Sequence, residues 1–64
     1  MWYFVEVNFQ GRPLLIQKPF RDEREAEQAA IRETTSGTYR ILSYPTRDKR
    51  LVYRLWKNSQ MQMQ

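Results

Sequence analysis

Apolar and aromatic residues alternate with other residues along the first nine positions of the chain. Tyr3, Val5, Val7 and Phe9 fall on one face of residues 2–9. The opposite face carries Trp2, Phe4, Glu6 and Asn8. A period of two with β-branched and aromatic side chains is typical of a strand. The pattern therefore predicts a first strand over residues 2–9.

A second strand follows after a tight turn. Gln10-Gly11 favours a hairpin turn, because glycine tolerates the positive φ that such turns require. Residues 12–18 continue with an apolar centre. Pro13 has no N–H group to donate to a neighbouring strand, so we expect this second strand to lie at an edge of the sheet.

Strong helix formers dominate the region after the second strand. Asp22 with Glu25 three residues later has the spacing of a capping box, and an alanine-rich segment follows. The small side chains of Ala26, Ala29 and Ala30 would let a helix lie close to a sheet. Gly37 follows hydroxyl residues that end the pattern. We predict a helix over about residues 22–35.

The rest of the chain predicts a second hairpin. Residues 38–44 and 50–57 both alternate like strands and flank a polar turn, whereas residues 58–64 show no periodic burial. The expected fold class is α+β, in two layers with element order ββαββ. One helix packs on one face of a four-stranded, mostly antiparallel sheet. Residues 1–57 form a single domain and residues 58–64 a flexible C-terminal tail.

One helix covers only one face of such a sheet, and the other face would be rich in aromatic residues. It would hold Trp2, Phe4, Val52 and Trp56 among others. Because monomers rarely expose large apolar patches, Trp2 and Phe4 become candidates for an interface with a second copy or another protein. Alternatively, these aromatics stack on nucleic-acid bases, or the tryptophans fold over the sheet edge and complete the core.

Charge is distributed unevenly along the chain. Residues 1–36 hold five Lys or Arg against six Asp or Glu, a net charge of −1, whereas residues 37–64 hold six against one, a net charge of +5. Basic and aromatic residues interleave in the predicted hairpin, which suits phosphates and bases. Arginine on the solvent face of a strand gives the same pattern. The candidate partner-binding residues are Arg40, Tyr44, Arg47, Lys49, Arg50, Arg54, Trp56 and Lys57.

The sequence lacks the residues that several kinds of chemistry require. The chain has neither cysteine nor histidine, which removes disulfides, the usual zinc sites and the common nucleophile–base pairs. Its only glycines, Gly11 and Gly37, do not make a phosphate-binding loop. We expect no enzyme activity, cofactor, metal or small-molecule substrate. The apolar run at the start ends at Glu6 without a basic segment before it, so we expect a soluble, cytoplasmic protein that does not bind membranes.

Residues 39–42 and 50–55 resemble the terminal hairpin of RelE/ParE-type toxins, without the helical hairpin that precedes it in that family. The resemblance implies a ribonuclease that uses Arg, Lys and Tyr. The leading hypothesis is instead a small non-catalytic binding module whose basic aromatic hairpin contacts nucleic acid or an acidic protein surface. The alternative is a protein–protein adaptor or inhibitor, of the kind found among phage and bacterial accessory proteins. Such an adaptor or inhibitor would act through the uncovered sheet face, either as a monomer or as a homodimer.

Overall fold

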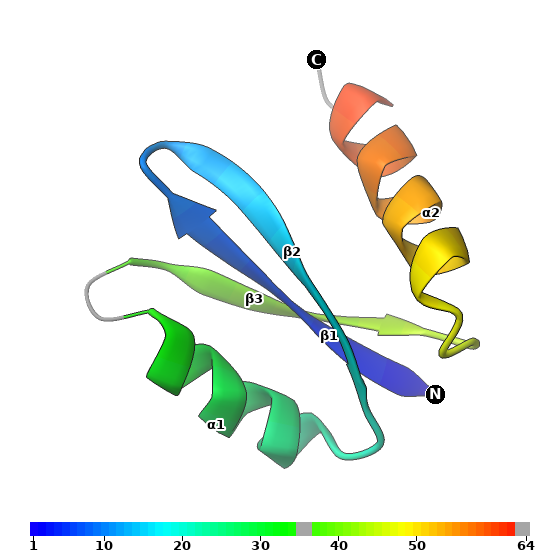
Figure 1. Cartoon of the computed structure of the whole chain (residues 1–64), viewed down its shortest axis with the longest axis horizontal. Coiled ribbons are helices and arrows are strands. Elements are labelled where there is room, and N and C mark those ends of the chain that lie inside the picture. The colour runs from blue at the N-terminus through cyan, green and yellow to red at the C-terminus, as the bar shows by residue number, and fades with distance from the viewer. Residues whose placement is uncertain (35–36, 63–64) are drawn as a thin grey trace.

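Three antiparallel strands and two helices make up the fold, in the order ββαβα (Figure 1). The structure is a computed structural model that describes residues 1–34 and 37–62. Strand β1 lies in the centre of the sheet, between β2 and β3. The elements are β1 (Trp2–Phe9), β2 (Arg12–Phe20), α1 (Glu23–Glu33), β3 (Tyr39–Tyr44) and α2 (Lys49–Gln62).

The β1–β2 hairpin forms as the sequence predicts. Gln10 and Gly11 both have positive φ, at 53° and 79°, and the Asn8 side chain accepts a hydrogen bond from the Gly11 N–H at 3.1 Å. Strand β2 is an edge strand, which explains how Pro13 is tolerated there. Contrary to expectation, β2 continues past Lys18, and its register with β1 shifts between Ile16 and Phe20: Ile16 pairs with Val5, but Phe20 pairs with Tyr3.

Helix α1 also matches its predicted position. The Asp22 carboxylate caps it by accepting a hydrogen bond from the Arg24 N–H at 3.0 Å. At its other end, Gly37 is needed for space and not for a left-handed backbone: a Cβ there would lie 2.8 Å from the Thr34 hydroxyl and 3.0 Å from the Asn8 carbonyl oxygen. Residues 35–36 of the predicted helix lie outside the described residues.

The predicted fourth strand is wrong, because residues 49–62 form helix α2. Asp48 caps this helix, accepting hydrogen bonds from the N–H groups of Arg50 at 3.1 Å and Leu51 at 3.4 Å. The helix runs through residue 57, where we placed the domain end, into the predicted tail. The fold is therefore α+β with three strands and two helices, and not four strands with one helix.

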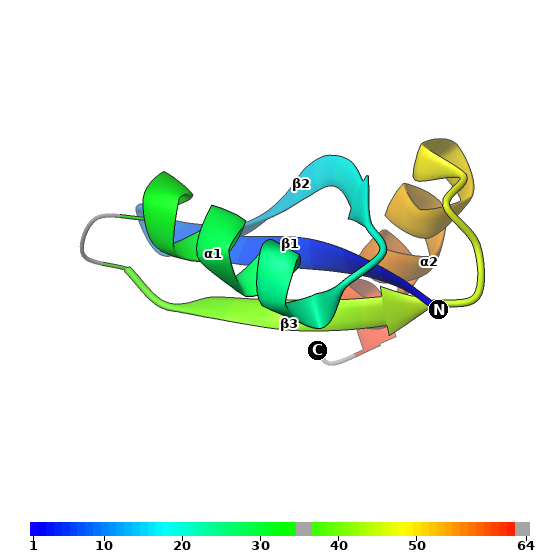
Figure 2. The same ribbon diagram turned by 90° about the horizontal axis from the view of Figure 1, so that it is seen from below.

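The two helices lie on opposite sides of the sheet (Figures 1 and 2). Val5 of β1 is fully buried with Ala26 and Ala30 of α1. The neighbouring residue Phe4 points to the opposite face, because side chains alternate along a strand. On that face, the Trp56 indole of α2 donates a hydrogen bond to Glu6 of β1. Val52 and Trp56 of α2 are buried there.

The face that we expected to be uncovered is thus covered by α2. Of the residues expected on that face, Phe4 and Val52 are fully buried and Trp56 is 7% exposed, whereas Trp2 and Tyr44 are half-buried. The resemblance to RelE/ParE-type toxins also loses its structural basis, since residues 50–55 are helical. In the part of the chain that the structure describes, neither helix is long and apolar enough to cross a membrane.

Candidate functional site: a basic groove between α2 and β2

Helix α2 separates its residues into three stripes. Val52 and Trp56, four residues apart, face the sheet and are buried. Leu51 and Leu55 form a second stripe and are 41% and 43% exposed. Arg50, Arg54 and Lys57 form a third, exposed stripe, because residues three or four apart lie on one side of a helix. We call this third stripe the basic stripe.

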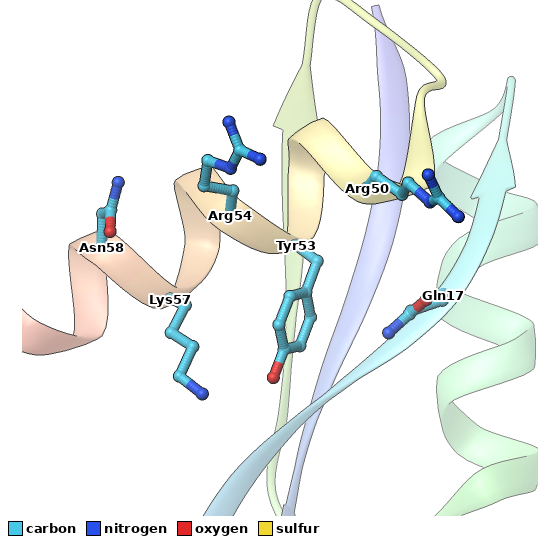
Figure 3. Close-up of a pocket in the computed structure, with 6 residues that line it drawn as sticks. All are labelled: Gln17, Arg50, Tyr53, Arg54, Lys57 and Asn58. Atoms are coloured by element: carbon cyan, nitrogen blue, oxygen red, sulfur yellow. The ribbon is translucent and has the colours of Figure 1, made fainter.

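The basic stripe borders a pocket of about 510 Å³ between α2 and β2. Figure 3 shows Tyr53 and Lys57 projecting from α2 toward β2, where Gln17 lies. The pocket combines three cations, one phenol ring and two amide side chains. Its lining residues are Gln17, Arg50, Tyr53, Arg54, Lys57 and Asn58.

A second pocket, of about 280 Å³, adjoins the first and has a different character. Tyr53 and Lys57 line both pockets and therefore stand between them. The rest of its lining is mainly apolar and comes from the start of β2 and the end of α2: Pro13, Leu14, Leu15, Trp56 and Gln60. We call the two together the groove, with a basic pocket and an apolar pocket.

Aromatic rings shape the boundary between the two pockets. The rings of Tyr53 and Trp56 lie 5.8 Å apart at 43°, and the Lys57 ammonium lies 5.6 Å from the Tyr53 ring centre. Trp56 is almost fully buried and cannot swing away, whereas Tyr53 is half-buried. The groove therefore presents a ring packed against Trp56, together with an exposed cation at its edge.

Positive charge concentrates along α2, which has the Asp48 carboxylate at its N-cap. The helix carries Lys49 and the basic stripe but no acidic residue. Lys49 and Arg50 lie in the first turn, where the positive end of the helix dipole makes basic side chains unfavourable for helix stability. Among the described residues, the members of the basic stripe form no salt bridge. The basic stripe is therefore an exposed cluster of positive charge at the edge of the groove.

Glu6 at the sheet centre accepts hydrogen bonds from two other elements, β3 and α2. Its Oε2 accepts from Arg40 Nε at 3.0 Å, and its Oε1 accepts from Arg40 Nη2 at 3.3 Å. The same Oε1 accepts from the Trp56 indole at 2.7 Å and the Gln60 amide at 2.9 Å. The Glu6 side chain is only 12% exposed. Arg40, a candidate site residue, is therefore engaged with Glu6 across the β1–β3 pair and does not line the groove.

The other candidates lie apart from the groove. The Arg47 and Arg21 guanidinium groups lie 5.7 and 5.4 Å from the ring centre of Trp2, at the opposite end of β1 from the hairpin. Tyr44 packs edge-on against Phe4, with ring centres 5.9 Å apart. Burial raises the pKa of Tyr44 above its ordinary value, and the Glu6 charge raises it further, whereas Arg40 lowers it.

The structure thus brings three of the predicted site residues together in the basic pocket: Arg50, Arg54 and Lys57. Trp56 lies behind them as core and as a wall of the apolar pocket. Sequence reasoning missed Gln17, Tyr53 and Asn58 as site residues. A helical spacing would have pointed to the last two, because positions 50, 53, 54, 57 and 58 share one helix side. Nothing in the sequence pointed to Gln17.

A third pocket, of about 430 Å³, lies near the hairpin and the end of α1, with Glu33 as its charged residue. Among the described residues, no group of carboxylates gathers in a way that could hold a metal ion. Comparisons with protein-family profiles, curated proteins and solved structures find no match to this chain. In the groove, positive charge and aromatic rings line the same concave surface.

Proposed function

We propose that this protein is a nucleic-acid-binding module whose contact surface is the groove between α2 and β2. One observation carries the proposal: Arg50, Arg54 and Lys57 line a single pocket, beside the Tyr53 ring. Phosphate groups supply the negative charge that this stripe lacks, and a ring beside cations is the combination that binds bases and backbone together.

The composition of the groove favours nucleic acid over an acidic protein surface. A purely acidic partner would need only the cations. The groove adds a supported aromatic ring and the amide groups of Gln17 and Asn58, which donate and accept the hydrogen bonds that base edges offer. Binding to an acidic protein remains a distinct outcome that the experiment separates.

The test measures binding of fluorescent oligonucleotides by anisotropy over a series of salt concentrations. Replacing the basic stripe with glutamine at Arg50, Arg54 and Lys57 should weaken binding by at least about tenfold at low salt. The slope of log affinity against log salt should shrink by about 2–3, since each phosphate contact contributes about 0.7–0.9.

A matched control removes the same charge elsewhere. Glutamine at Arg12, Arg24 and Arg32 also removes three positive charges, from exposed positions outside the groove. This control should keep most of the affinity and of the salt slope. Equal losses in the two triple variants would reduce the effect to net charge alone. Polyglutamate binding as tight as an oligonucleotide of equal charge would favour an acidic protein partner instead.

A further inference from the structure

The groove has two pockets of opposite character that share one wall, and this pairing suggests the form of nucleic acid that fits. We infer that the protein binds single-stranded nucleic acid, with one base in the apolar pocket and the adjoining phosphates along the basic pocket. The inference rests on the proposed function and adds to it the strandedness of the ligand and the place of the base.

The apolar pocket has the chemistry of a base site. Leu14, Leu15 and Pro13 form its β2 side, and the Tyr53 and Trp56 rings lie on its α2 side. Aromatic and apolar walls suit the flat face of a base, because every base has a π-face that stacks without regard to sequence. The Gln60 amide is held by Glu6 at the pocket edge and fixes that wall.

The basic pocket begins where the apolar pocket ends. Lys57 lines both, with its ammonium beside the Tyr53 ring, so a phosphate next to a stacked base would meet this cation first. Arg54 and Arg50 follow along the helix, one turn apart at about 6 Å. A strand with its base in one pocket thus has cations along the direction in which its backbone continues.

A duplex cannot use this arrangement. Its bases are paired inside the stack, and only their edges reach the grooves, so none can enter the apolar pocket without being flipped out at a cost of a few kcal/mol. A helix that reads a duplex also has to protrude into the major groove. In α2 the Tyr53 and Lys57 side chains project toward β2 instead (Figure 3).

The experiment compares four probes of about 15 nucleotides at one salt concentration: single-stranded DNA, single-stranded RNA, the DNA duplex and an abasic strand with the same phosphates. The two single strands should bind at least about tenfold more tightly than the duplex and the abasic strand. The abasic strand isolates the contribution of the bases, because its backbone charge is unchanged. RNA and DNA arms show whether the 2′-hydroxyl matters.

Two variants test the apolar pocket directly. Tyr53→Leu keeps an apolar side chain but removes the ring, and it should weaken single-strand binding by about tenfold. Leu14→Gln places an amide in the apolar pocket and should also weaken single-strand binding. Leu14 is 48% exposed, so this change should leave folding unaffected. Leu55→Gln, at 43% exposure and outside both pockets, is the matched control and should bind like the parent protein.

Trp56 provides an optical readout of the same contact. In a Trp2→Phe background it is the only tryptophan of the chain, and it lines the apolar pocket. Single strands should change its emission, whereas the abasic strand should not.

The outcomes separate this inference from the proposed function. The inference would be overturned if the duplex bound as tightly as the single strands and if affinity fell in the basic-stripe variant but not in Tyr53→Leu or Leu14→Gln. The proposed function would still stand in that case. Absence of binding to all four probes at low salt would overturn both.

Discussion

Tyr44 lies half-buried at the end of β3, edge-on against the Phe4 ring, and the charges of Glu6 and Arg40 act on its hydroxyl group. Burial, and after it the Glu6 charge, holds its pKa above the ordinary value of 10.0. The folded protein therefore keeps the phenol proton at pH values where the unfolded chain has begun to lose it. The contribution of Tyr44 to the free energy of unfolding is therefore fully present below about pH 10 and declines as the pH rises through the raised pKa.

Tyr44→Phe tests the direction of this pH dependence, because phenylalanine keeps the ring and removes the group that titrates. The difference in free energy of unfolding between variant and parent should move in favour of the variant as the pH rises from about 8 to about 11. Urea unfolding followed by circular dichroism at several pH values measures it. Other groups that titrate in this range cancel in the difference. A difference that stays constant with pH would show that folding does not shift this phenol.

At the scale of elements, α2 is attached to the sheet by apolar burial and by one carboxylate. Glu6 accepts four hydrogen bonds, and two of them, from Trp56 and Gln60, come from α2. Removing the acceptor leaves the indole N–H of a buried tryptophan without a partner, which is more costly than the bond itself is stabilising. The other two come from Arg40 of β3, so the Glu6 side chain links β1, β3 and α2.

Glu6→Ala should lower the free energy of unfolding by about 2–3 kcal/mol, and Glu6→Gln by less, because the amide keeps one acceptor oxygen. Arg40 is more than half exposed, so water replaces its part of the network and it contributes little to this loss. Urea unfolding gives the values. Glu27→Ala, an exposed glutamate on α1, should change stability by no more than about 0.5 kcal/mol. Equal effects at Glu6 and Glu27 would refute the role of the network.

The elements that sequence reasoning predicted correctly share a clear local signal. Strand β1 alternates without interruption, and α1 has an acidic cap before a run of strong helix formers. Strand β3 was also placed to within a residue of its observed start. In each case the propensity of the residues and the periodicity of the pattern agree.

Helix α2 was missed because propensity and periodicity disagree there. Val52, Tyr53 and Trp56 favour strands, and a period of two places Leu51, Tyr53 and Leu55 on one face. The same alternation places the charged Arg54 on one strand face with the apolar Val52 and Trp56. A helical period places Arg54 on a different side from these two residues. Asp48, taken as part of a turn, has the position and chemistry of an N-cap. The groove could not be foreseen without α2, and the contribution of Gln17 depends on tertiary packing alone.

At the scale of the whole molecule, one strand serves two cores. Val5 of β1 packs toward α1 and its neighbour Phe4 toward the α2 side, and both are fully buried. A chain of 64 residues has a stability of about 3–10 kcal/mol, so neither core has much in reserve. Because adjacent residues of one strand belong to different cores, loss of either core disturbs the backbone that supports the other. We therefore expect a single cooperative unfolding transition.

Val52→Ala tests this coupling and its consequence for binding. The cavity under α2 should lower stability by about 2 kcal/mol. Circular dichroism and Trp56 fluorescence, in the Trp2→Phe background, should still report coincident transitions. The groove is built from α2 and β2 together, so it exists only in the folded molecule. Oligonucleotide affinity should then fall only by the folded fraction, and saturating oligonucleotide should raise the midpoint. An earlier transition by fluorescence alone would mean that α2 detaches while the sheet and α1 persist, and the groove would then be a separable part of the fold.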